Sequence, residues 1–130
     1  MKVMLIEDDP TVLEELSAVL RRLSYDVVSC SSAEEALAKI LDCAPDAVIA
    51  DAGLPGISGG EFVRFAAKVK PRISFFMISG DIHRLEEERR KSGDVPIVTL
   101  SKPIRPKALI GILGSHPQPK VLKCGGATGY

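Results

Sequence analysis

Polar residues that could do chemistry stand where four apolar runs of this sequence end. In chain order they are Glu7, Asp8, Asp51, Ser79 and Lys102. If burial alone had shaped these positions, we would expect apolar residues or scattered turn formers there. If the four runs are parallel strands, their carboxyl ends lie at one edge of a sheet, where ligands bind in open α/β folds. The pattern therefore predicts one shared site.

The chemistry of that site follows from its three carboxylates. Carboxylates held close together repel one another, raise one another's pKa and need a counter-ion. Mg²⁺ is suited to this role because it prefers oxygen ligands in octahedral geometry and keeps several waters. We expect one or two carboxylates, a backbone carbonyl from the loop after Asp51 and an incoming phosphate around it. Lys102 adds a positive charge and Ser79 a hydroxyl donor, so the set suits phosphoryl transfer.

Asp51 is the candidate nucleophile. It lies in VIADAGLPG, where a buried run opens into a loop of small residues. Carboxylates can form acyl phosphates, and the small side chains of Ala52 and Gly53 leave the approach open for in-line attack.

Five strands and five helices must position these residues. We expect strands over about 2–6, 25–30, 46–50, 73–79 and 96–100, with a helix after each and the last over about 105–113. Alternation with short connections predicts an α/β fold, in which a parallel sheet is covered by helices through right-handed crossovers.

Helix starts and inner faces can also be predicted. Asp9 before Pro10 fits a helix cap, and Ser32 with Glu35 has capping-box spacing. The residues expected to face the core in the later helices are Ala36, Leu37, Ile40, Leu41, Phe62, Val63, Ala66, Val69, Ile82 and Leu85. The run EEERRK predicts a solvated face with Glu86–Arg90 and Glu87–Lys91 pairs.

These motifs closely resemble the receiver domain of two-component response regulators. The resemblance covers about residues 1 to 113 through LIEDD, VIADAGLPGISG, MISG and SKP, in that order. It implies a flavodoxin-like, doubly wound sheet of five parallel strands in the order 2-1-3-4-5. It also implies that a histidine kinase or phosphotransfer protein supplies the phosphoryl group, and that the last α/β faces pass the signal to an effector protein.

The same resemblance implies a role for each site residue. Asp51 matches the phospho-accepting aspartate, and Glu7 and Asp8 match the acid pair that holds Mg²⁺. The backbone carbonyl of Gly53 matches the third protein ligand, and Ser79 the switch hydroxyl. Lys102 matches the family's lysine, and the bond between it and the following proline is usually cis in the family.

Alternatives remain at two levels. Asp8 and Asp9 could form the acid pair, although Asp9 fits a helix cap better. Thr99 stands where the family commonly has an aromatic switch residue, so a pseudo-receiver that binds proteins with atypical or no phosphorylation switching is the second hypothesis. A phosphohydrolase with an aspartyl nucleophile fits poorly, since such enzymes usually need an acid at the position of Gly53 and a cap domain.

Composition sets the remaining expectations. Lys plus Arg and Asp plus Glu both total 17, which gives no bulk electrostatic reason to expect direct binding of nucleic acid or an anionic membrane. Cys30, Cys43 and Cys124 form no CxxC pair, and no signal peptide or membrane span is evident, so we expect a cytoplasmic protein.

We expect a receiver domain over 1–114 and a flexible tail over 115–130. The position of Met1 suggests a natural start, and homodimer formation stays open.

Overall fold

The computed structural model of this protein describes residues 1–115 and confirms the alternation of strands and helices. The elements are β1 (Lys2–Ile6), α1 (Pro10–Arg22), β2 (Asp26–Cys30), α2 (Ala33–Cys43), β3 (Ala47–Asp51), α3 (Gly59–Val69), β4 (Ser74–Ser79), α4 (Ile82–Lys91), β5 (Ile97–Ser101) and α5 (Pro106–Ser115). The predicted tail falls outside the described residues, apart from the final residue of α5.

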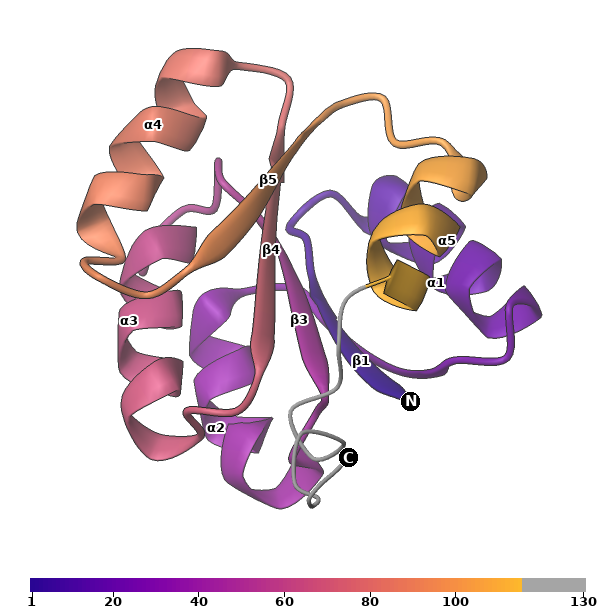
Figure 1. Cartoon of the computed structure of the whole chain (residues 1–130), viewed down its shortest axis with the longest axis horizontal. Coiled ribbons are helices and arrows are strands. Elements are labelled where there is room, and N and C mark those ends of the chain that lie inside the picture. Colours follow the sequence, from indigo (N-terminus) through magenta and orange to yellow (C-terminus); the bar gives the residue numbers. More distant parts are fainter. Residues whose placement is uncertain (116–130) are drawn as a thin grey trace.

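The five strands form one parallel sheet in the order β2-β1-β3-β4-β5, as predicted. Helices α2, α3 and α4 cover one face, and α1 and α5 cover the other (Figure 1). The central strands read as continuous apolar runs because both of their faces are buried. β3, for example, is buried at every position.

Alternation along the strands divides the core into two layers. Met4 and Ile6 of β1 face α2, α3 and α4, whereas Val3 and Leu5 face α1 and α5. Phe62 fills the first layer and is fully buried. Residues two apart in a strand share a face, so each short strand contributes to both layers.

The predicted helix starts are present. The Asp9 carboxylate accepts hydrogen bonds from the backbone N–H groups of Thr11 (2.9 Å) and Val12 (3.4 Å), and Pro10 is the first residue of α1. Ser32 caps α2 by accepting from the backbone N–H of Glu35. The carboxylate of Glu35 bonds to the residue before Ser32, so the expected capping box closes one position early.

Three residues predicted to face the core are exposed: Leu41 (61%), Val69 (48%) and Ile82 (67%). The buried stripe of α2 passes through Ile40, and Leu41 is turned about 100° further round the helix. Val69 is the last residue of α3 and Ile82 the first of α4, so both lie at the margins of their helices.

The prediction of a fully solvated polar face on α4 is wrong at one position. Glu88 is buried in the last turn of α4 with an exposed fraction of 1%. The ion pair that Lys91 makes is with Glu88, at 3.2 Å, rather than with Glu87.

Candidate functional site

Parallel strands bring the predicted site residues to one edge of the sheet. Glu7 directly follows β1, Asp51 ends β3, Ser79 ends β4, and Lys102 directly follows β5. Because β1, β3, β4 and β5 are neighbours in the sheet, four segments far apart in sequence end side by side.

Three carboxylates gather at this edge. Glu7, Asp8 and Asp51 each place one oxygen so that the three atoms lie within 4.8 Å of one another. Glu7 and Asp51 are buried, and Asp8 is exposed. Asp9 directs its side chain to the start of α1 instead, where it caps the helix.

Lys102 connects two of the carboxylates. Its Nζ lies 3.1 Å from Oε1 of Glu7 and 3.5 Å from Oδ2 of Asp51. The second oxygen of Glu7 accepts a hydrogen bond from the backbone N–H of Asp9 at 3.2 Å. One ammonium therefore faces a cluster of three carboxylates, and this imbalance favours an additional cation.

Burial and the neighbouring charges shift the pKa values of both Glu7 and Lys102. Burial raises the pKa of Glu7 above its ordinary value, and the nearby charge of Asp51 raises it further. The hydrogen bonds from the Asp9 backbone and Lys102 act in the opposite direction but do not outweigh burial. Burial would lower the pKa of Lys102, but its hydrogen bond to Glu7 and the charge of Asp51 raise that pKa overall.

Ser79 is the last residue of β4, and Gly53 lies in the loop that follows β3. The backbone N–H of Gly53 donates to Oδ1 of Asp51 at 3.1 Å, which holds the carboxylate over its own loop. The Ser79 hydroxyl oxygen accepts from the backbone N–H of Asp81 at 3.0 Å, and the Ser79 carbonyl accepts from the backbone N–H of Lys102 at 2.9 Å. The peptide bond between Lys102 and Pro103 is cis.

The loop after Asp51 is held by two contacts that the predictions above do not include. Ser58 caps α3 in a reciprocal capping box with Glu61. A Cβ added to Gly59 would lie 3.0 Å from the backbone carbonyl of Asp51, so α3 begins in close contact with the end of β3. Ser58 and Glu61 have the spacing of a capping box, so the cap at the start of α3 could have been predicted from the sequence, whereas the contact between Gly59 and Asp51 could not.

Thr99 occupies a half-buried position on β5 beside α4. The guanidinium of Arg89 lies 3.4 Å from the Thr99 hydroxyl and donates to it. A cavity of about 300 Å³ is lined by Thr99, Arg89, Ile82 and neighbouring residues of α4 and β5. The space between β5 and α4 could therefore hold a larger side chain than that of Thr99.

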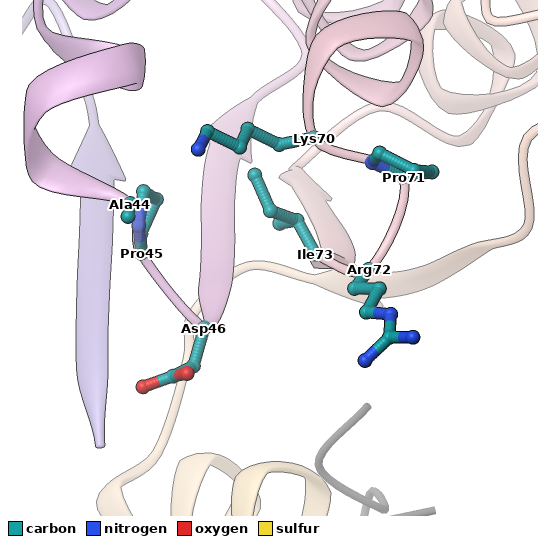
Figure 2. A pocket seen from close by; sticks show the side chains of 7 residues that line it. All are labelled: Ala44, Pro45, Asp46, Lys70, Pro71, Arg72 and Ile73. Carbon is teal, nitrogen blue, oxygen red and sulfur yellow. The ribbon is translucent and has the colours of Figure 1, made fainter. Parts of the chain in front are cut away.

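A second hollow lies at the opposite end of β3. It is lined by Ala44, Pro45, Asp46, Lys70, Pro71, Arg72 and Ile73 (Figure 2). Lys70 extends across it toward the Ala44–Pro45 turn. Since Asp46 precedes β3 and Asp51 ends it, this hollow takes no part in the carboxylate cluster.

The fold and this acidic edge define a class of signalling domain. A family model for the response regulator receiver domain matches residues 3–113. The chain therefore belongs to the response regulator receiver domain family, and the predicted resemblance is confirmed. The family is a signalling family and not a group of conventional enzymes. None of the helices in residues 1–115 is long and apolar enough to cross a membrane.

Individual relatives show how far the similarity extends. The transcriptional regulatory protein AruR of Pseudomonas aeruginosa is 30% identical over 117 residues, covering 84% of this chain and 46% of AruR. The response regulator protein FleR of the same species is 29% identical, covering 88% of this chain and 24% of FleR. The chain thus spans less than half the length of these curated relatives.

A solved structure supports the same conclusion for the fold. The chemotaxis protein CheY4 of Vibrio cholerae superposes with a TM-score of 0.78 at 25% identity, covering 87% of this chain and 95% of that chain.

Proposed function

We propose that this chain is a receiver that accepts a phosphoryl group on Asp51 in a Mg²⁺-dependent reaction. One observation carries the proposal: Glu7, Asp8 and Asp51 converge within 4.8 Å beside the ammonium of Lys102. The donor is a histidine kinase or a phosphotransfer protein, and the product is an acyl phosphate. A conformational change then passes the signal to an effector protein.

The residues fit a divalent cation. Glu7, Asp8, Asp51 and the carbonyl of Gly53 would hold Mg²⁺, because their oxygens are the hard ligands that this ion prefers. When bound, the ion neutralises negative charge on the cluster and on the transferring group. The excess of carboxylates over ammonium groups is the feature that supports this assignment.

The chain's own groups divide the remaining work. A carboxylate oxygen of Asp51 attacks phosphorus, a new P–O bond forms, and the bond between phosphorus and the donor breaks with its electron pair going to the donor. The Gly53 N–H orients the attacking carboxylate, and Lys102 stabilises charge on it and then on the phosphoryl oxygens. The Ser79 hydroxyl, which accepts from Asp81 in this state, turns to donate to a phosphoryl oxygen.

The proposal carries further expectations about partners and place. A cytoplasmic protein that meets a kinase and an effector protein is expected, without direct nucleic-acid or membrane binding, and homodimer formation stays open. The zero net charge supports the expectation that the chain binds neither nucleic acid nor an anionic membrane directly.

A pseudo-receiver is the second candidate because Thr99 and its contact with Arg89 replace the aromatic switch. Such a module would bind proteins with atypical phosphorylation switching or with none. A wild-type chain that takes up no phosphoryl group in the labelling experiment would favour it.

The test uses acetyl phosphate and Mg²⁺ with intact-mass spectrometry. We expect the wild-type chain to gain one phosphoryl group, with acetate as the leaving group, and Asp51→Asn to gain none. The exposed Asp94→Asn variant is the matched control and should be labelled like wild type. Equal labelling of wild type and Asp51→Asn would overturn the assignment, and no labelling of wild type would favour the pseudo-receiver.

A further inference from the structure

Helix α4 carries a buried carboxylate that the proposed phosphorylation chemistry does not use. Glu88 is 1% exposed, and its Oε1 accepts a hydrogen bond from the backbone N–H of Gly60 at 2.8 Å. Its other oxygen, Oε2, lies 3.2 Å from Nζ of Lys91. A buried carboxylate is costly unless its oxygens are paired, and here both are.

The partner of Glu88 lies at the start of α3. Gly60 is the second residue of that helix, so its N–H is one of the donors that the helix itself leaves unpaired. The helix dipole also favours a negative charge at this position. Glu88 of α4 therefore supplies the hydrogen-bond acceptor and the negative charge that the N-terminus of α3 lacks.

Gly60 allows the two helices to approach closely. A Cβ at this position would overlap the backbone carbonyl of Glu88 and would lie 2.9 Å from Cβ of Lys91. Helices α3 and α4 lie side by side on the same face of the sheet (Figure 1). The hydrogen bond and the missing side chain together fix the end of α4 against the start of α3.

The same stretch of α3 contacts the end of β3. Gly59, the neighbour of Gly60, packs so closely that an added Cβ would lie 3.0 Å from the backbone carbonyl of Asp51. Two consecutive glycines thus connect the carboxylate of Glu88 with the backbone of Asp51. The connection runs entirely through main chain and one buried side chain, with no flexible surface group between them.

Helix α4 is attached to the site at its other end as well. The backbone N–H of Asp81, the cap of α4, donates to the Ser79 hydroxyl at 3.0 Å. A change at Ser79 therefore acts on the start of α4, while Glu88 holds its end.

We propose that Glu88 is a positioning residue for the Asp51 loop: its hydrogen bond to Gly60 holds the start of α3, and with it the backbone around Asp51, in a fixed relation to α4. The inference deepens the proposed function and rests on it for its consequence in phosphorylation. Coupling of this kind is reciprocal, so a displacement of α4 alters the backbone around Asp51, and a change at Asp51 alters the packing of α4.

Three variants isolate the hydrogen bond. Glu88→Met keeps the volume of the side chain but leaves the buried Gly60 N–H without its acceptor. Glu88→Gln keeps an acceptor oxygen and should restore wild-type behaviour. Lys91→Ala removes the half-exposed counter-charge and leaves the bond to Gly60 in place, so it is the matched control. If Glu88→Met does not fold, Glu88→Asp takes its place, because the shorter side chain does not reach Gly60.

The first measurement needs no phosphodonor. Amide hydrogen exchange by NMR should be faster by about threefold to tenfold at Ala52 and Gly53 in Glu88→Met. Exchange at these two amides should be unchanged in Glu88→Gln and Lys91→Ala. Exchange in β1 should be unchanged in all three variants. The second measurement is the initial rate of labelling by acetyl phosphate at saturating Mg²⁺. It should fall about tenfold in Glu88→Met, less than the hundredfold that a misplacement of about 1 Å can cause.

The outcomes separate the two proposals. Unchanged exchange at Ala52 and Gly53 in a folded Glu88→Met or Glu88→Asp variant overturns the positioning role. If Glu88→Gln shows the same faster exchange and slower labelling as Glu88→Met, the positioning role is also overturned. The cause would then be the lost charge and not the lost hydrogen bond. If the wild-type chain is not labelled at all, the proposed function fails, while the exchange measurement still decides the role of Glu88.

Discussion

The ammonium of Lys102 lies 3.1 Å from the carboxylate of Glu7, although 95 positions separate the two residues in the sequence. Glu7 is almost fully buried, whereas Lys102 is partly open to solvent. The arrangement keeps an acid inside the protein next to Asp51 and leaves the lysine able to turn toward an incoming group. Removing the lysine should therefore affect stability as well as phosphorylation.

We expect Lys102→Met to lower the free energy of unfolding by about 1–3 kcal/mol at pH 7 without Mg²⁺, because a buried carboxylate loses its partner. Loss of the ammonium raises the folded-state pKa of Glu7 further. A carboxyl whose folded pKa is raised contributes most stability below its unfolded pKa and loses it as pH rises through the folded value. The penalty should therefore shrink as pH falls, in urea unfolding followed from pH 7 to pH 4.

The matched double variant checks the cause of that penalty. Adding Glu7→Gln to Lys102→Met should recover part of the lost stability, since no buried charge then remains unpaired. Additive effects of the two substitutions would contradict the pairing.

A second prediction concerns the metal. Glu7→Gln should weaken Mg²⁺ binding about tenfold or more, because one carboxylate leaves the cluster. Isothermal titration without a phosphodonor measures this directly. Asp9→Asn is the control: Asp9 caps α1 in the structure, so its loss should cost at most about 1 kcal/mol of stability and leave Mg²⁺ affinity nearly unchanged. A larger loss of affinity in Asp9→Asn would favour Asp8 and Asp9 as the acid pair.

A third prediction concerns acid stability at the start of α2. The hydrogen bond from Lys39, with further hydrogen bonds from Ser31, lowers the pKa of Glu35 to about 2. A lowered folded pKa stabilises the protein above the unfolded value and loses that contribution as pH falls through the folded value. Glu35→Gln should cost about 0.3–1 kcal/mol at pH 7, because the pair is solvent-screened, and almost nothing near pH 2. A penalty that stays constant between these pH values would show that the charge of Glu35 is not its source.

A fourth prediction concerns Cys30. Burial raises the pKa of its thiol to about 11, with a smaller contribution from the charge of Glu35. The neutral thiol is favoured in the folded state, so its stabilising contribution is complete below about pH 9 and is lost as pH rises toward 11.

In a Cys43→Ser/Cys124→Ser background, the Cys30 thiol should not react with a thiol reagent at pH 8 until the protein unfolds. Reaction within seconds in the folded protein would show that Cys30 is accessible.

Much of the fold could be predicted because local signals agreed with one another. Asp9 and Pro10 marked the start of α1, and continuous apolar runs marked strands that are covered on both faces. The carboxyl ends of those strands predicted that Glu7, Asp51 and Lys102 lie together, as the structure shows. The roles of these residues in phosphorylation stay predictions.

The predictions of burial were wrong where helical periodicity alone does not indicate which element packs against a helix. Ile82 is apolar and yet exposed at the start of α4, whereas Glu88 is charged and yet buried. Burial of Glu88 depends on its hydrogen bond from the backbone N–H of Gly60. Gly60 belongs to another helix, so the local sequence pattern of α4 does not indicate it. No rule of composition or periodicity in the sequence of α4 predicts that contact.

The close packing at Gly60 also sets how this domain can be recombined. Because the backbone of α4 occupies the space where a side chain at residue 60 would lie, the two helices are matched by shape as well as by a hydrogen bond. A chimera that takes α4 alone from another receiver would place unmatched surfaces in contact. Domain engineering should therefore transfer residues 59–91 as one cassette, with both helices and the strand between them.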